Sequence, residues 1–183
     1  IAGKILEIDV AQHSVTQNPP AVTRFNELPV AIQQSLTVMA KGVRNIPGIS
    51  FQRFQNQYIK YVGNVGQDLA EAIFSFVQYR PMAVSQLVQN SLNEEGFINF
   101  GWRSWEGTFP TSIVEDCSKN SDSSKKTIAY YDEAVKTSVN RLHPLTDYFH
   151  KDARPDKFGG TALTGVQPYI GNEIPNLTGT VLF

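Results

Sequence analysis

Two histidines and an aspartate in the last third of the sequence have the spacing of a metal site. His143, Asp147 and His150 lie four and then three residues apart, so on a continuous helix they would share one face. Two imidazoles and a carboxylate could bind zinc or another divalent metal and leave one position open. The objection is Pro144, which disfavours helical geometry at His143. The alternative needs no cofactor: these histidines would interact only with a helix end and nearby carboxylates.

A second candidate site is aromatic. Phe51, Phe54, Tyr58 and Tyr61 recur three or four residues apart, which is the spacing of one helix face. Such a stripe could line a pocket for an apolar ligand between helices. The alternative is that the same rings fill the core of a helical bundle.

The remaining catalytic candidates have weaker signals. Cys117 is the only cysteine, which excludes an internal disulfide, and its acidic neighbours Glu115 and Asp116 would raise a thiol pKa rather than activate it. The pair Glu94–Glu95, and Glu106 beside Trp105, could supply carboxylates for acid–base chemistry. Neither a serine nucleophile elbow nor a phosphate-binding glycine loop occurs in the sequence. These signals favour a protein that is not an enzyme, with a metal-dependent enzyme at His143, Asp147 and His150 kept as an alternative.

Composition indicates a globular chain of one domain. Of 183 residues, 41% are hydrophobic and 18% charged, with 16 Lys and Arg against 17 Asp and Glu. This balance excludes nucleic acid and an anionic membrane as main partners, because both require clustered positive charge. The longest apolar run, Ala70–Val77, is interrupted by Glu71 and is too short to span a bilayer.

The elements that would position these residues are predicted to be helices. Apolar residues repeat at helical spacing in several segments. The expected helices run from Asn26 to Pro47–Gly48, from Ser50 to Gly63–Gly66, from Gln67 to Tyr79, from Pro81 to Gly96, and from Ser123 or Ser124 to Ala153, with a kink at Pro144. The sequence thus predicts a mainly α fold: a bundle of four to five helices over residues 26–153.

An extended arm is expected on each side of this bundle. In the N-terminal arm, residues 1–25, the alternation of Leu6, Ile8 and Val10 with Glu7 and Asp9 predicts a short strand. The C-terminal arm, residues 154–183, has no helical period but is too apolar for a solvated linker. Each arm should therefore have a docking surface, on this chain or on a neighbour.

Three functions follow, in order of preference. The first is a non-enzymatic subunit of a larger assembly, such as a capsid, filament or multi-subunit complex, bound to like or unlike protein subunits through residues 1–25 and 154–183. The second is a soluble helical carrier of a small apolar ligand, and the third is a metal-dependent enzyme.

Because the first residue is Ile1 rather than Met, we expect a processed or trimmed product. No signal segment assigns a compartment, and Asn176 begins a short glycosylation sequence.

Overall fold

The computed structural model describes the chain in segments that together form a β protein. The described residues are 3–8, 25–27, 29–67, 69–77, 82–83, 98–102, 104–111, 114–115, 128–129, 140–150, 160 and 162–183. Within them the only α-helix is α1 (Val30–Ser35), and single turns of 3₁₀ helix lie at Phe25–Glu27 and Pro175–Leu177. The predicted mainly α bundle over residues 26–153 is therefore wrong.

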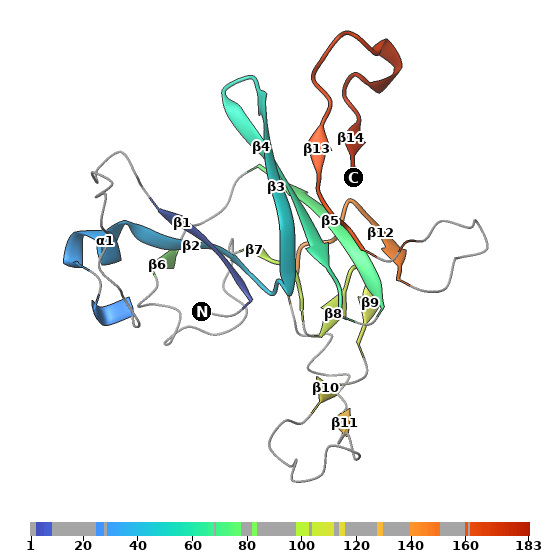
Figure 1. The fold of residues 1–183 in the computed structure, drawn as a ribbon. Helices are drawn as coiled ribbons and strands as arrows, with labels where there is room; N and C mark the ends of the chain where they lie inside the picture. The colour runs from blue at the N-terminus through green and yellow to red at the C-terminus, as the bar shows by residue number, and fades with distance from the viewer. Residues whose placement is uncertain are drawn as a thin grey trace.

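Strands make up the regular structure of the described residues (Figure 1). They are β1 (Lys4–Ile8), β2 (Leu36–Lys41), β3 (Asn45–Phe54), β4 (Gln57–Val65), β5 (Ala70–Phe76), β6 (Met82–Ala83), β7 (Ile98–Asn99), β8 (Trp105–Glu106), β9 (Phe109–Pro110), β10 (Val114–Glu115), β11 (Ile128–Ala129), β12 (Thr146–Phe149), β13 (Gln167–Pro168) and β14 (Val181–Leu182).

The central sheet is antiparallel, with the strand order β12-β5-β4-β3. Its longest strands, β3 and β4, form a hairpin that projects beyond the rest of the sheet (Figure 1). The turn of this hairpin is Gln55–Asn56, in which Gln55 has a φ of 54°. A positive φ in a two-residue turn matches the twist of the strands that the turn connects.

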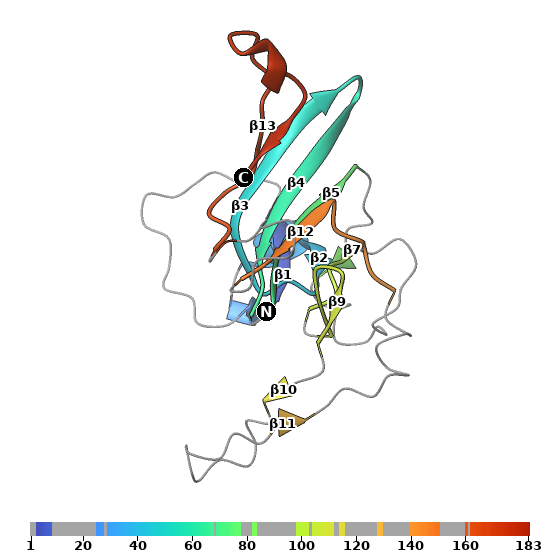
Figure 2. The ribbon, with the colours of Figure 1, turned by 90° about the vertical axis from the view of Figure 1, so that its right-hand side faces the viewer.

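A smaller sheet packs beside the central one. In it β2 pairs antiparallel with β1 and with β6, and parallel with β7. Figure 2 shows that the β3–β4 hairpin and β13 extend in the same direction from the central sheet. Strand β13 also pairs with β14, so the C-terminal segment turns back on itself as a narrow ribbon.

The main core lies between the two sheets. At its centre the rings of Phe74 on β5 and Phe100 after β7 meet edge to face, with their centroids 4.4 Å apart. This geometry suits two aromatic quadrupoles. The buried residues of this core are Ile5, Met39, Ala40, Val43, Val62, Ala72, Phe74, Phe76 and Phe100.

A second core lies on the opposite face of the central sheet, where the C-terminal segment crosses it. Here Leu163 and Val166 pack against Tyr61 and Ile73. Gly63 on β4 leaves the space for this packing, because a Cβ there would lie 2.6 Å from the Leu163 side chain. Strand β5 is thus covered on both faces.

The helical prediction for residues 50–66 failed because spacing there is ambiguous. Residues three and four apart do share a helix face, but the segment contains a turn that no glycine marks. On the two strands, cross-strand pairing joins Phe51 with Lys60 and Phe54 with Gln57. The aromatic stripe is therefore divided between the two faces of a hairpin.

The other predicted helices are also replaced by strands where they are described. In the described part of residues 26–47, the end of a 3₁₀ turn and the short α1 precede β2, and residues 70–76 form β5. The segment 81–96 lies outside the described residues except for β6, and the segment 123–153 contributes β11 and β12. Because β5 is buried on both faces, its sequence shows no alternation that would separate a strand from a buried helix.

The predicted arms have different outcomes. Strand β1 is present at residues 4–8, as its alternation predicts, but it pairs with β2 of the same chain. Residues 9–24 and 154–159 lie outside the described residues. No helix in the described segments has the length and apolar character needed to cross a membrane.

Candidate functional site

The C-terminal ribbon, residues 167–183, projects from the body of the molecule and is well ordered by its own hydrogen bonds. The amide of Tyr169 donates to Thr180 O (2.9 Å), and that of Gly179 donates to Tyr169 O (3.1 Å). The Tyr169 hydroxyl also accepts a bond from the amide of Ile174 (2.9 Å). Thr178 closes the loop further, because its hydroxyl donates to Gly171 O (3.0 Å). The ribbon is a preformed loop rather than a loose tail.

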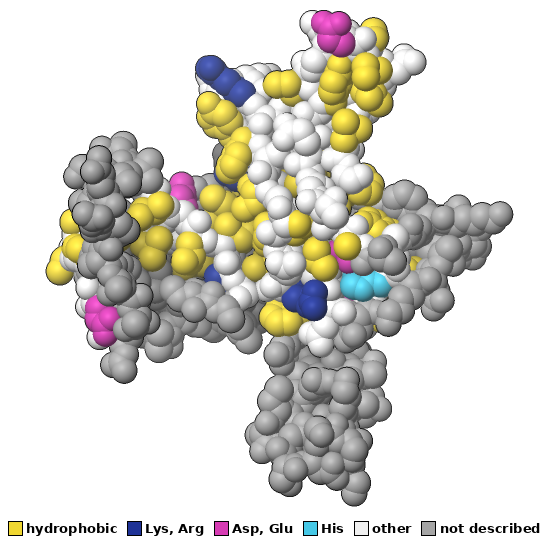
Figure 3. Space-filling view, in the orientation of Figure 1, with side chains coloured by type: hydrophobic (Ala, Val, Ile, Leu, Met, Phe, Trp, Pro, Cys, Tyr) yellow, Lys and Arg dark blue, Asp and Glu magenta, His cyan; other side chains and the backbone are white. Residues whose placement is uncertain are grey.

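Apolar side chains on this ribbon face solvent. Ile170 is 70% exposed and Ile174 is 51% exposed, although both lie in the hydrogen-bonded loop. Figure 3 shows hydrophobic side chains gathered along the projecting ribbon and on the neighbouring hairpin. The other large apolar residues exposed on these two projections are Phe51, Phe54, Tyr58, Leu182 and Phe183. Exposed apolar groups at this density are typical of interaction surfaces.

A hollow lies at the open end of the main core, between β1 and the β3–β4 hairpin. It has a volume of about 460 Å³, within the roughly 300–1,000 Å³ of small-molecule sites. The described residues that line it are Ile5, Leu6, Glu7, Met39, Ile49, Phe51, Tyr58 and Lys60.

The structure divides the four predicted ligand-binding aromatics. Phe51 and Tyr58 line the hollow. Tyr61 is buried in the second core and donates a hydrogen bond from its hydroxyl to Gln52 (2.9 Å). Phe54 is 58% exposed near the hairpin turn. The predicted aromatic site is therefore not brought together as one set.

Lys60 is a buried, titratable residue of the hollow that sequence reasoning did not single out. Its side chain is buried on β4, and Nζ donates to Val77 O (2.8 Å) and Tyr58 O (3.1 Å). Burial lowers the pKa of Lys60, whereas the charge of Glu7 raises it. The sequence signal was a lysine between apolar residues, with Tyr58 and Ile59 before it and Tyr61 and Val62 after it.

The predicted metal face is not assembled. Strand β12 includes Asp147, and because strands alternate, side chains three residues apart point to opposite faces. Asp147 Oδ2 accepts bonds from the Thr108 amide (2.6 Å) and hydroxyl (2.7 Å), whereas His143 is exposed. The described residues contain no group of three or more His, Cys, Asp or Glu that could hold a metal ion.

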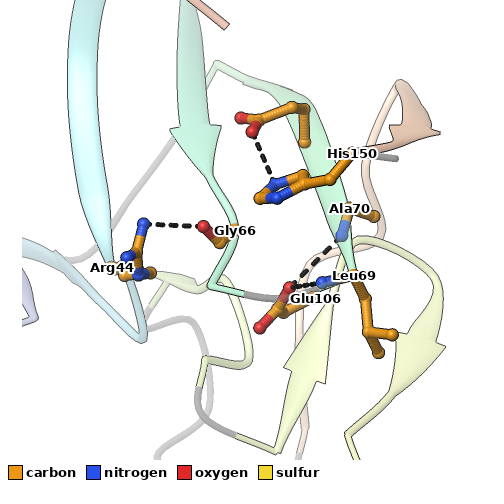
Figure 4. A network of polar contacts seen from close by, with 7 residues as sticks. Arg44, Gly66, Leu69, Ala70, Glu106 and His150 are labelled. Carbon is orange, nitrogen blue, oxygen red and sulfur yellow. Dashed lines mark hydrogen bonds and ion pairs between the residues drawn. The ribbon is translucent and has the colours of Figure 1, made fainter. Parts of the chain in front are cut away.

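His150 instead contacts Glu71, which lies on β5 and is fully buried (Figure 4). His150 Nε2 lies 2.6 Å from Glu71 Oε1, an ion-pair distance, but the two atoms do not form a hydrogen bond of good geometry. Burial raises the pKa of Glu71, and His150, Arg44 and the backbone at Leu163 and Gly66 oppose that rise without reversing it.

This raised pKa predicts a pH dependence of stability. The pKa of Glu71 in the folded protein lies above its ordinary value of 4.5, so the folded state retains a proton that the unfolded state releases. The contribution of the Glu71 carboxyl group to the free energy of unfolding is therefore fully present below the ordinary pKa. This contribution is lost as the pH rises through the folded-state pKa. Glu71→Gln removes this loss, so its unfolding free energy relative to wild type should increase as the pH rises from the ordinary pKa through the folded-state pKa.

Urea denaturation at several pH values measures this effect. Exposed Glu173 provides the matched control, since Glu173→Gln should differ from wild type by less than about 0.5 kcal/mol at every pH. A difference between Glu71→Gln and wild type that stays constant or shrinks with rising pH would contradict the prediction.

The Glu106 carboxylate accepts hydrogen bonds from the backbone and so has a structural role. Its Oε2 accepts hydrogen bonds from the amides of Leu69 (2.8 Å) and Ala70 (3.2 Å) at the start of β5 (Figure 4). Arg44 lies near the same corner and donates from its guanidinium to Gly66 O (2.6 Å). These groups fix the turn between β4 and β5. The other candidates Glu94–Glu95 and Cys117 lie outside the described residues.

Comparison of the chain with protein-family models, curated proteins and solved structures gives no match.

Proposed function

We propose that this chain is a non-enzymatic interaction subunit that docks onto neighbouring protein subunits through its C-terminal ribbon. The observation that carries the proposal is the pair Ile170 and Ile174, held exposed by a loop whose backbone is already hydrogen-bonded. A preformed loop loses little conformational entropy on binding. Burial of an isoleucine stabilises an interface by roughly 1.5–3 kcal/mol.

The hairpin extends this surface. By strand alternation Phe54 shares a face of the hairpin with Tyr61, which packs against the C-terminal segment in the second core. Phe54 and the ribbon therefore lie on the same side of the central sheet. The expected N-terminal arm does not enter the proposal, because its described residues pair within the chain as β1.

The double variant Ile170→Asp/Ile174→Asp tests the proposal. We expect it to weaken association about 100-fold or more, because two apolar contacts of roughly 1.5 kcal/mol or more each would be lost. Sedimentation velocity over a range of protein concentrations measures the association. Val30→Asp is the matched control, since Val30 is 67% exposed but lies on α1, away from the ribbon.

Limited proteolysis and thermal unfolding complete the test. If neighbours stabilise the chain, the unfolding temperature of the wild type should rise with protein concentration, and that of the double variant should not. A rate of ribbon cleavage that does not fall as the wild type associates would contradict the proposal, because docking should protect the ribbon from protease.

A further inference from the structure

The hollow beside β1 lies where the main core opens to solvent. The hairpin extends past the smaller sheet, so its inward face is covered at Val62 but uncovered at Phe51 and Tyr58. Pairing places Phe51 directly opposite Lys60, and Lys60 directly opposite Phe76 on β5. The floor of the hollow is thus an apolar surface with one fixed ammonium group.

Among the described residues that line the hollow, charge is balanced. Lys60 and Glu7 both line it, so an anionic ligand would meet the Glu7 carboxylate and a cationic ligand would meet the Lys60 ammonium. Two backbone carbonyls hold Lys60 Nζ in place. A charged head group would have to compete with this arrangement and lose its own hydration. An uncharged group that forms hydrogen bonds avoids both costs.

We infer that this hollow binds a small, uncharged, largely apolar molecule with a single hydrogen-bonding group. Its apolar body contacts Ile5, Met39 and Ile49 on the floor and Phe51 at the rim, and its polar group lies at the Lys60–Glu7 end. This inference rests on the hollow alone and is independent of the docking ribbon.

Two aromatic probes with the same ring system test both parts of the inference. N-phenyl-1-naphthylamine is uncharged and carries one N–H group, whereas 8-anilinonaphthalene-1-sulfonate adds an anionic sulfonate to the same rings. Isothermal titration calorimetry of the wild type should show one saturable site for the uncharged probe. The sulfonate should bind at least tenfold more weakly, and Glu7→Gln should reduce that difference.

A pair of variants on β1 locates the site. Leu6 and Ile8 lie on the same face of β1 and are 41% and 43% exposed, but only Leu6 lines the hollow. Leu6→Trp should fill the hollow and weaken the uncharged probe at least tenfold, whereas Ile8→Trp should leave its affinity within about twofold. Far-ultraviolet circular dichroism establishes that both variants are folded.

Three results would overturn the inference. They are no saturable binding of the uncharged probe to the wild type, equal loss of affinity in Leu6→Trp and Ile8→Trp, and tighter binding of the sulfonate than of the uncharged probe. The ribbon variant Ile170→Asp/Ile174→Asp should bind the probe as the wild type does. Failure of probe binding and failure of subunit docking are therefore separate outcomes.

Discussion

Phe100→Ala should lower the free energy of unfolding by about 3–5 kcal/mol. Phe100 is 1% exposed, and its ring centroid lies 4.4 Å from that of Phe74 and 6.1 Å from that of Phe76. Its removal leaves a cavity between the two sheets that backbone shifts alone do not close, because the Phe100 amide is also bonded to Lys41 O on β2 (2.9 Å). Urea denaturation monitored by circular dichroism measures the loss.

The control for this prediction is Val30→Ala. Val30 is 67% exposed on α1, so its truncation should change the unfolding free energy by less than about 0.5 kcal/mol. A loss below about 1 kcal/mol for Phe100→Ala would contradict the assignment of this ring to the centre of the core.

The second large effect is expected from Gly66→Ala. A Cβ on Gly66 would overlap the carbonyl oxygen of Ala70 and lie 2.6 Å from Glu106 Oε2. Both neighbours are fixed: Ala70 begins β5, and Glu106 holds the amides of Leu69 and Ala70. The turn between β4 and β5 must therefore open, at a cost of about 3 kcal/mol or more.

Gly165→Ala is the matched control, because a Cβ on Gly165 meets no atom within 4 Å. Its effect on the unfolding free energy should stay within about 0.5 kcal/mol, or be slightly stabilising through the unfolded state. Amide hydrogen exchange gives a local measurement: Leu69 and Ala70 should exchange faster in Gly66→Ala. Equal stability of the two alanine variants would show that the corner at Gly66 is not closely packed.

The sequence identified the N-terminal strand but not the sheet to which the central strands belong. Alternation marked β1 as a strand, although its apolar residues Leu6 and Ile8 lie on the exposed face and Ile5 is the buried residue. Strand β5 is covered by the main core on one face and by Leu163 and Val166 on the other, so both faces are buried, and Ile73 between Glu71 and Ser75 weakens the period of two. The β3–β4 turn contains no glycine that would mark it in the sequence. Gln55 itself adopts the left-handed conformation there.

The candidate site was predicted only in part for the same reason. Helical spacing grouped Phe51 with Phe54, whereas strand pairing places them on opposite faces of the hairpin. Phe51 and Tyr58 remain together because their strands pair in register around the turn. Glu71 was noted only as an interruption of an apolar run, yet a single carboxyl group in such a run was the signal of a buried titratable group whose partner, His150, is distant in sequence.

The pairing of β12 with β5 also affects how the chain folds. Strands β3, β4 and β5 follow one another through short connections, whereas Phe149 of β12 pairs with Ala70. The entropic cost of closing a loop increases with its length, and sheets with distant pairings fold slowly. We expect the three consecutive strands to form first and β12 to join late. Until it does, β5 is an open edge at which two partly folded chains can pair and aggregate.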